Sequence, residues 1–378
     1  MKRLLPFLSL LLCATANRLP HPHLRTLDPN RPPQTLPDLI HTILPDLDFD
    51  LDLPDHGSDP NSNPDPDSDS IILPPGLGYT LTWHDEFTSS PNTNNENDGD
   101  SHLPSSANWL FSTGTSYPAG APNWGNNELQ TYTTDPSNIQ ITSENTLKII
   151  PRYTPEGEGQ TGHWTSSRIE THHTTFSAPA LGKLYIESRL RTGCAPSSQQ
   201  RGIWPAFWAL GASFREDPTF WPMASEWDFV EVINGEDVVY NTLHCGNNRE
   251  AGGPCNEFNG LGNGGVPWEG CGWHVVGFEV DRSGSSSFSG SFSGTGGGSG
   301  GGWERETLKW FIDGEQTWAV SGADVGDEGV WESIAHQGHF LLLNVAVGGN
   351  WPGYPDSQTV DGEEIAMEVD YVRVWNAD

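Results

Sequence analysis

Basic residues are scarce in this chain. Its 378 residues include 18 Lys and Arg against 50 Asp and Glu, which gives a formal net charge of −32 at pH 7. Proteins bind nucleic acids largely by neutralising phosphates with Lys and Arg, so this balance excludes nucleic acid as an expected partner. Much of the acidity lies between Asp46 and Asp69, and it therefore characterises one segment more than a binding site.

Long apolar runs are also lacking. After the N-terminus no stretch reaches the roughly 20 apolar residues that a membrane-spanning helix needs. The start, "MKRLLPFLSLLLCATA", combines Lys2 and Arg3 with a short apolar stretch and a small-residue cleavage site, as secretory signals do. We predict that residues 1–16 are a signal peptide, and that the mature protein is soluble, secreted and extracellular, with no membrane partner. No Asn-x-Ser/Thr acceptor occurs, so N-glycosylation is not expected.

Cysteines are few. Removing Cys13 with the signal leaves Cys194, Cys245, Cys255 and Cys271. In an oxidising compartment this even set predicts two disulfides, with three possible connectivities. We favour Cys245 with Cys255 because they bracket a short Gly-rich stretch, "CGNNREAGGPC", which leaves Cys194 to pair with Cys271. A zinc site is the alternative, but the C-x-x-C spacing that such sites normally use is absent.

Sustained helical periodicity is nearly absent as well. Residues 17–75 are rich in Pro, Asp and Asn, and this composition predicts a disordered segment or a pro-segment. From residue 76 onward, short runs of Ile, Val, Trp, Tyr and Phe alternate with clusters of Gly, Asn, Pro and Ser. Most runs show period-two alternation, which predicts strands at 145–153, 182–191, 228–234, 273–282, 308–316, 339–349 and 366–375. We expect one all-β domain over 76–378, an antiparallel sandwich or barrel.

A Gly/Ser-rich stretch, residues 283–302, interrupts this pattern between two predicted strands. We interpret it as an enlarged, flexible hairpin loop, because the cost of closing a loop grows only slowly with its length. A domain boundary is the alternative, but the strand pattern resumes at once after residue 302.

The stretch "SEWDFVEV", residues 225–232, places three carboxylates inside a run of strand-forming residues. Glu226 and Asp228 project from one face of a regular strand, whereas Glu231 projects from the other. A single β-bulge near Phe229 and Val230 would bring all three onto one side, with these two side chains and Trp227 in the core. Paired carboxylates suit retaining glycoside hydrolysis, in which one attacks the anomeric carbon and the other donates and then removes a proton. A solvated acidic strand face is the alternative.

Tryptophan is plentiful, with 16 residues, and several lie close to these carboxylates in the sequence. Trp204 and Trp208 are four residues apart, and Trp221 comes five residues before Glu226. Aromatic rings stack on the C–H faces of sugars, so the cluster favours a carbohydrate site. Ordinary burial in the core is the alternative for any one of these rings.

The globular part, from Tyr79 to Trp375, resembles glycoside hydrolase family 16, the laminarinase-like endo-β-glucanases. The motifs that carry the resemblance are "WHDEF", "NWGNNELQTYT", "SSRIET", "GIWPAFWALG", "SEWDFVEV", "LNVAVGGNWPG" and "VDYVRVW". The resemblance implies a β-jelly-roll sandwich, concanavalin-like, of two antiparallel sheets with an open concave substrate cleft. This chain departs from the family's common pattern at Ser225 and Trp227, where many members have Gly and a small aliphatic residue.

The resemblance also implies roles for particular residues. Glu226 is expected to be the nucleophile, Asp228 the assisting carboxylate and Glu231 the general acid/base. Further residues are expected to line the cleft or bind sugar hydroxyls: Trp204, Trp208, Trp221, His244, Arg168, Asn127 and Trp351. His244 could instead be a structural histidine.

Some members of the family carry a structural calcium that involves an Asp similar to Asp370. We expect no cofactor to be required, with calcium as a possible structural ion. The expected protein is a monomeric endo-glycosidase that acts on internal β-1,3 or mixed β-1,3/1,4 bonds of glucans. A transglycosylase with the same carboxylates is the first alternative, and a non-catalytic, lectin-like glucan-binding protein is the second.

Overall fold

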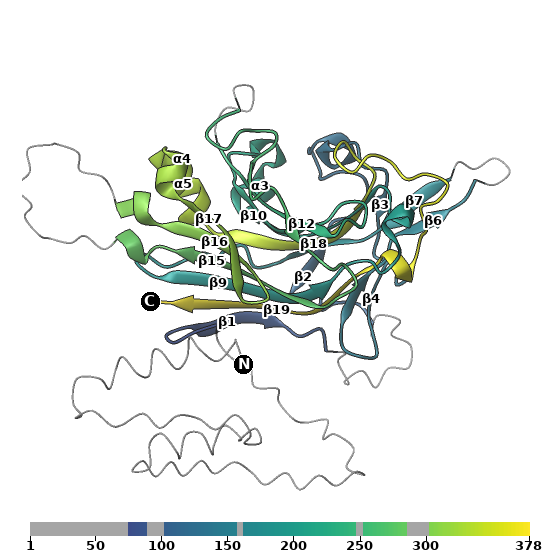
Figure 1. Cartoon of the computed structure of the whole chain (residues 1–378), viewed down its shortest axis with the longest axis horizontal. Coiled ribbons are helices and arrows are strands. Elements are labelled where there is room, and N and C mark those ends of the chain that lie inside the picture. The colour runs from purple at the N-terminus through teal and green to yellow at the C-terminus, as the bar shows by residue number, and fades with distance from the viewer. Residues whose placement is uncertain (1–74, 89–101, 157–161, 247–251, 286–301) are drawn as a thin grey trace, which may run out of the picture. The chain divides into compact units, whose positions relative to one another are not determined.

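Two large antiparallel sheets lie one over the other in the computed structural model, with β10, β12 and β18 in one and β9, β15 and β19 in the other (Figure 1). The structure describes residues 75–88, 102–156, 162–246, 252–285 and 302–378. The predicted signal peptide and the acidic segment that follows it lie outside these residues, apart from residue 75. The predicted all-β class and sandwich architecture are confirmed.

The sheet that carries the three carboxylates of β11 is called the carboxylate sheet below. Its strands run in the order β13-β12-β11-β10-β18-β8-β2, and β14 pairs with β12. Their bounds are β2 (Trp109–Phe111), β8 (Arg168–Thr171), β10 (Ile203–Gly211), β11 (Glu226–Glu231), β12 (Val238–His244), β13 (Leu261–Gly262), β14 (Val266–Pro267) and β18 (His339–Val347).

The second sheet, called the opposite sheet, runs β17-β16-β15-β9-β19-β5-β4, and β1 pairs with β19. Its strands are β1 (Thr80–Asp85), β4 (Ile139–Ile141), β5 (Leu147–Ile149), β9 (Lys183–Arg191), β15 (His274–Asp281), β16 (Thr307–Ile312), β17 (Glu315–Ser321) and β19 (Met367–Ala377). A small third sheet contains β3 (Thr131–Tyr132), β6 (Arg152–Thr154) and β7 (His163–Ser166). Each of the seven predicted strand regions holds at least part of a strand, so these predictions are confirmed.

Side-chain periodicity explains the two layers. The strand β9 alternates partly buried and buried positions along its whole length, as a strand with one core-facing side does. In contrast β18 is buried at all nine positions, which matches its nearly continuous apolar sequence "HFLLLNVAV". Between the sheets, Trp227 and Phe229 of β11 pack on Phe278 of β15, with ring centroids 4.9 and 4.8 Å apart.

The described helices are short. They are α3 (Ser213–Glu216), α4 (Gly322–Val325) and α5 (Glu328–Ala335), with 3-10 turns η1 (Pro122–Gly125), η2 (Ser197–Gln199), η3 (Pro218–Phe220), η4 (Ser283–Ser285), η5 (Gly302–Arg305) and η6 (Glu363–Ile365). Asp327 caps α5 by accepting a hydrogen bond from the amide of Val330. Among the described residues, none of the helices has the length and apolar character that crossing a membrane requires.

Both favoured disulfides are present. Cys194 bonds to Cys271 and Cys245 bonds to Cys255, with Cα atoms 4.5 and 5.3 Å apart. This pairing confirms the prediction made from the short Gly-rich stretch between Cys245 and Cys255.

The Gly/Ser-rich stretch lies between two strands that pair with each other. In the opposite sheet β15 and β16 are antiparallel neighbours, and Asp281 lies across from Thr307. The strands on either side of the stretch are therefore neighbours in one sheet, and its interpretation as a flexible loop stays a prediction. Residues 286–301 lie outside the described part of the chain.

Candidate active site

A β-bulge lies where the carboxylate spacing predicted it. Asp228 pairs with Thr242 of β12, and Glu231 pairs with Tyr240. Three steps along β11 therefore match two steps along β12, which is the signature of one extra residue. The register with β10 shifts at the same place. The bulge returns Glu231 to the face that carries Glu226 and Asp228.

Side chains from elsewhere satisfy the backbone of the bulge. The Trp310 indole of β16 donates a hydrogen bond to the carbonyl of Asp228 at 2.8 Å, and Asn241 Nδ2 donates to the carbonyl of Phe229 at 2.7 Å. Phe229 and Val230 are both fully buried, as predicted. Because an unpaired buried carbonyl is costly, these two donors stabilise the irregular strand between Asp228 and Glu231.

Strand pairing shows which residues share the carboxylate-bearing face of the carboxylate sheet. On β11, Glu226, Asp228 and Glu231 lie opposite Leu210, Trp208 and Ala206 of β10. On the other side, β12 contributes His244, Thr242 and Tyr240, and β18 places Asn344 next to Ala206. The predicted residues Trp204, Trp208 and His244 therefore come together with the three carboxylates.

Glu226 is partly buried and is held by an indole. Its Oε2 accepts a hydrogen bond from Trp221 Nε1 at 3.1 Å. Burial raises the pKa of Glu226, while His244 and the Trp221 N–H lower it. The donors and the positive charge thus stabilise the ionised form of this carboxyl group against the cost of burial.

Asp228 lies deepest of the three. It is 2 % exposed, and its Oδ2 has no hydrogen-bond partner within the described part of the chain. Burial, with the added repulsion of Glu231 and Glu226, raises the pKa of Asp228 well above its ordinary value. Burial and the neighbouring acids therefore favour the protonated form of this carboxyl group.

Glu231 has a pKa near neutrality. Its Oε1 accepts from Trp204 Nε1 at 3.2 Å, and its Oε2 accepts from Thr242 Oγ1 at 3.4 Å. Burial and the charge of Glu226 together raise the pKa of Glu231 to about 7, although the charge of His244 lowers it. A group with this pKa can both donate and accept a proton near pH 7.

His244 bridges the carboxylates to a fourth acid, Glu257. Its Nδ1 lies 2.8 Å from Glu257 Oε2, while its Nε2 lies 3.7 Å from Asp228 Oδ2 and 4.0 Å from Glu226 Oε1. Burial opposes the charge of His244, but the hydrogen bond to Glu257 and the charges of Glu226, Glu257 and Glu231 outweigh it and raise its pKa to about 9. His244 is therefore an imidazolium at neutral pH, and its role in the cleft stays a prediction.

Aromatic rings extend from both ends of the carboxylate row. Near Glu231, Trp204 packs edge to face with Trp351, with ring centroids 5.5 Å apart, and Trp351 is 43 % exposed. Tyr240 also lies against Trp351, at 5.1 Å. Asn127 donates to Asn350 at 2.8 Å, which places it beside this group of rings. The sugar contacts of Trp204, Trp351 and Asn127 stay predictions.

Arg168 is more enclosed than a direct sugar contact requires. It is 5 % exposed, and its guanidinium lies 4.7 Å from the ring of Trp208 and 4.7 Å from that of Trp124. Its Nη2 donates to the Tyr117 hydroxyl at 2.6 Å, and Trp208 donates to Asn344 at 2.7 Å. Arg168 thus supports the ring of Trp208 from beneath, and its contact with substrate stays a prediction.

The surroundings of Asp370 do not fit the predicted calcium. Its Oδ2 lies 2.7 Å from Arg189 Nη1, so a guanidinium already neutralises the carboxylate that a cation would need. Among the described residues, the one cluster of metal-ligating side chains is Glu226, Asp228 and His244, with ligand atoms within 4.8 Å of one another. These are the residues of the carboxylate row, and calcium binding stays a prediction.

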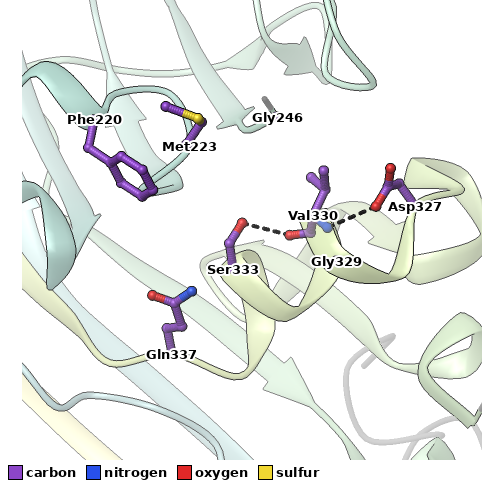
Figure 2. A pocket seen from close by; sticks show the side chains of 8 residues that line it. All are labelled: Phe220, Met223, Gly246, Asp327, Gly329, Val330, Ser333 and Gln337. Atoms are coloured by element: carbon purple, nitrogen blue, oxygen red, sulfur yellow. Dashed lines mark hydrogen bonds between the residues drawn. The ribbon is translucent and has the colours of Figure 1, made fainter. Parts of the chain in front are cut away.

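A separate hollow of about 310 Å³ lies between α5 and the segment that precedes β11 (Figure 2). Phe220, Met223 and Gly246 line one side, and residues of α5 line the other. Two of its polar side chains are engaged locally, because Asp327 accepts from Val330 N and Ser333 donates to Val330 O. The hollow contains none of the three carboxylates.

Sequence reasoning missed three residues that lie around the carboxylate row: Glu257, Phe258 and Tyr240. Phe258 stacks on Trp221, with ring centroids 6.1 Å apart. The signal that could have found Glu257 was its position two residues after Cys255, because the disulfide with Cys245 returns the chain to the end of the strand that holds His244. Tyr240 was detectable as the same-face neighbour of Thr242, two positions along β12.

Comparison with known proteins finds relatives over most of the chain, although no family model matches it. A beta-glucanase from Rhodothermus marinus is 28% identical over 305 residues, which cover 79% of this chain and 85% of that protein. The structure of an endo-1,3-beta-glucanase from Streptomyces sioyaensis is 35% identical with a TM-score of 0.67, and covers 81% of this chain and 99% of that one. An endo-beta-1,3-glucanase from Pyrococcus furiosus is 27% identical with a TM-score of 0.56, over 79% and 95% of the two chains.

Proposed function

This chain belongs to glycoside hydrolase family 16, among the laminarinase-like endo-β-1,3(4)-glucanases, and on that premise we propose that it cleaves internal β-1,3 bonds of glucans with retention at the anomeric carbon. The observation that supports this mechanism is the placement of two glutamates on one face of the bulged strand β11. Trp204 donates a hydrogen bond to Glu231, whose pKa is about 7, and Trp221 donates one to Glu226, whose pKa is raised by burial. An acid and a nucleophile on one strand face are what double displacement requires.

In the first step, a carboxylate oxygen of Glu226 bonds to the anomeric carbon as the glycosidic C–O bond breaks. The proton of Glu231 passes to the departing sugar oxygen, so the leaving group departs as a neutral hydroxyl. The indole of Trp204, 3.2 Å from Glu231 Oε1, stabilises the carboxylate that remains.

In the second step, Glu231 removes a proton from water, whose oxygen bonds to the anomeric carbon while the bond to Glu226 breaks. Both carboxyl groups return to their starting states. Burial raises the pKa of Asp228, and in its protonated form this neighbour can donate a hydrogen bond to Glu226 as the bond to the sugar breaks.

The glucan chain is proposed to lie across the carboxylate face, with aromatic rings at each end. Trp221 lies next to Glu226, and Trp204 with Trp351 lies next to Glu231. The protein is further proposed to be secreted, monomeric and independent of any cofactor. Mixed β-1,3/1,4 glucans are a second substrate class, because the same carboxylates serve either linkage.

Two alternatives are separated by experiment. Transglycosylation uses the same carboxylates, and products longer than a single defined oligosaccharide substrate would reveal it. A lectin-like role is disfavoured, because all three carboxylates are retained in distinct environments that a passive binding surface does not need.

The test uses the purified protein and its Glu226→Gln variant. Release of reducing ends is measured on laminarin, barley-type mixed-linkage glucan and cellulose oligomers. We expect hydrolysis of laminarin by the native protein and a loss of about 10³-fold or more in the variant. Unchanged release in the variant would show that Glu226 is not the nucleophile. Product lengths from one oligosaccharide then separate hydrolysis from transfer.

A further inference from the structure

The segment Cys255–Gly260 carries an exposed aromatic ring beside the carboxylate row. Phe258 is 66 % exposed, and it belongs to neither of the hydrophobic clusters formed by the described residues. Its ring stacks on Trp221, with centroids 6.1 Å apart and planes inclined by 19°. Trp221 in turn donates its indole hydrogen bond to Glu226. The two rings therefore extend the aromatic surface outward from the carboxylate row on the Glu226 side.

The backbone that carries Phe258 is fixed at three neighbouring points. Cys255 forms a disulfide with Cys245. The Glu257 carboxylate accepts a hydrogen bond from the amide of Cys245 at 2.9 Å and forms another with His244. Gly260 has a φ of +72°, and a Cβ there would lie 2.5 Å from Thr242 Cγ2. The segment thus passes directly over the carboxylate sheet, and only glycine fits at the crossing.

A fixed, exposed phenyl ring is a preorganised binding surface. A ligand that covers the exposed apolar area removes it from water, which favours binding. Little conformational entropy is lost on binding, because the backbone is already ordered. The ligand must be apolar on the face it presents yet compatible with the acidic surroundings. A β-linked glucosyl ring meets both conditions, because its faces are rows of C–H groups and its edge is uncharged.

We propose that Phe258, together with Trp221, forms an outer subsite that binds one glucosyl residue of the β-glucan chain beyond the site of cleavage on the Glu226 side. This assignment rests on the proposed function and adds to it a residue that sets the preferred substrate length. Phe258 touches neither the reacting bond nor the three carboxylates, so it acts on binding of long chains rather than on chemistry.

The test compares Phe258→Ala with the native protein on laminari-oligosaccharides of increasing length. For short oligosaccharides that do not reach the ring, kcat and KM should match those of the native protein. For longer ones, kcat/KM should fall about tenfold, mainly through KM. Phe258→Tyr keeps the ring and should retain native values. Tyr153→Ala, which removes an exposed aromatic ring from β6 in the small third sheet, should change neither kcat nor KM at any substrate length.

Either of two results would overturn the proposal that Phe258 forms a subsite. One is an equal loss of kcat/KM at every substrate length, which would mean that Phe258 acts through Trp221 on the carboxylates. The other is no loss at any length. Electrophoresis in gels containing laminarin adds a readout that needs no turnover: the native protein should be retarded, and Phe258→Ala should be retarded less. A native protein that is retarded but does not hydrolyse laminarin would refute the proposed activity, while the comparison with Phe258→Ala would still decide the subsite.

Discussion

Replacing Glu257 by Gln should move the alkaline limb of the pH profile of kcat/KM to higher pH. Glu257 raises the pKa of His244, which is about 9 against an ordinary value of 6.5. In turn, the His244 charge lowers the pKa of Glu231, which is about 7. Glu231 must be protonated to act as an acid, so kcat/KM of the native protein should fall as the pH rises through about 7.

The size of the shift follows from these values. The carboxylates around His244 together outweigh the effect of its burial and raise its pKa from 6.5 to about 9. At pH 7.5, His244 is almost entirely charged with a pKa of about 9, but only about one tenth charged if its pKa returns to 6.5. Losing this nearby charge should raise the pKa of Glu231, and with it the alkaline limb, by about one unit.

The assay is initial-rate kinetics on a soluble oligosaccharide across the pH range, with thermal unfolding measured in parallel. Asp313→Asn is the matched control, because Asp313 forms a comparable pair with His274 at 2.9 Å on the opposite sheet and should leave the profile unchanged. An alkaline limb in Glu257→Gln that stays in place or moves to lower pH would refute the reasoning. Loss of rate without a shift of the limb would mean that Glu257 only supports the loop.

Three further outcomes are expected. Glu231→Gln should lose far more activity on oligosaccharides with poor leaving groups than on activated aryl glycosides, and equal losses would contradict its acid role. Asp228→Asn should retain more kcat than Asp228→Ala, because the amide resembles the protonated acid; equal kcat in the two variants would indicate that Asp228 works as an anion. Replacing Cys245 and Cys255 together by Ser should lower the free energy of unfolding by about 3 kcal/mol in urea titrations; an unchanged midpoint would show that the disulfide contributes nothing to stability.

Features set by local pattern were predictable from the sequence. The bulge followed from the spacing of Glu226, Asp228 and Glu231, since no regular strand places all three on one face. The pairing of Cys245 with Cys255 followed from their short separation. Strands such as β9 followed from simple alternation along the chain.

Features that depend on distant segments were not predictable. The enclosure of Arg168 arises because Tyr117 and Trp124, from a separate part of the chain, cover its guanidinium. Glu257 and Phe258 lie in a segment without periodicity, and only the folded position of the loop shows that one faces inward and the other outward. The partner of Asp370, Arg189, comes from another strand, and no pattern around Asp370 announces it.

The bulge has a consequence for inactivation by heat. The carbonyl of Asp228 is held by Trp310, which belongs to the opposite sheet, so the spacing of the catalytic groups depends on contact between the two layers. Slight separation of the layers on warming would release this carbonyl before any strand detaches from its own sheet. We therefore expect activity to decline at a lower temperature than the far-ultraviolet circular dichroism signal, in step with the near-ultraviolet signal of the buried tryptophans. Coincident loss of all three signals would show that the layers and the strands come apart together.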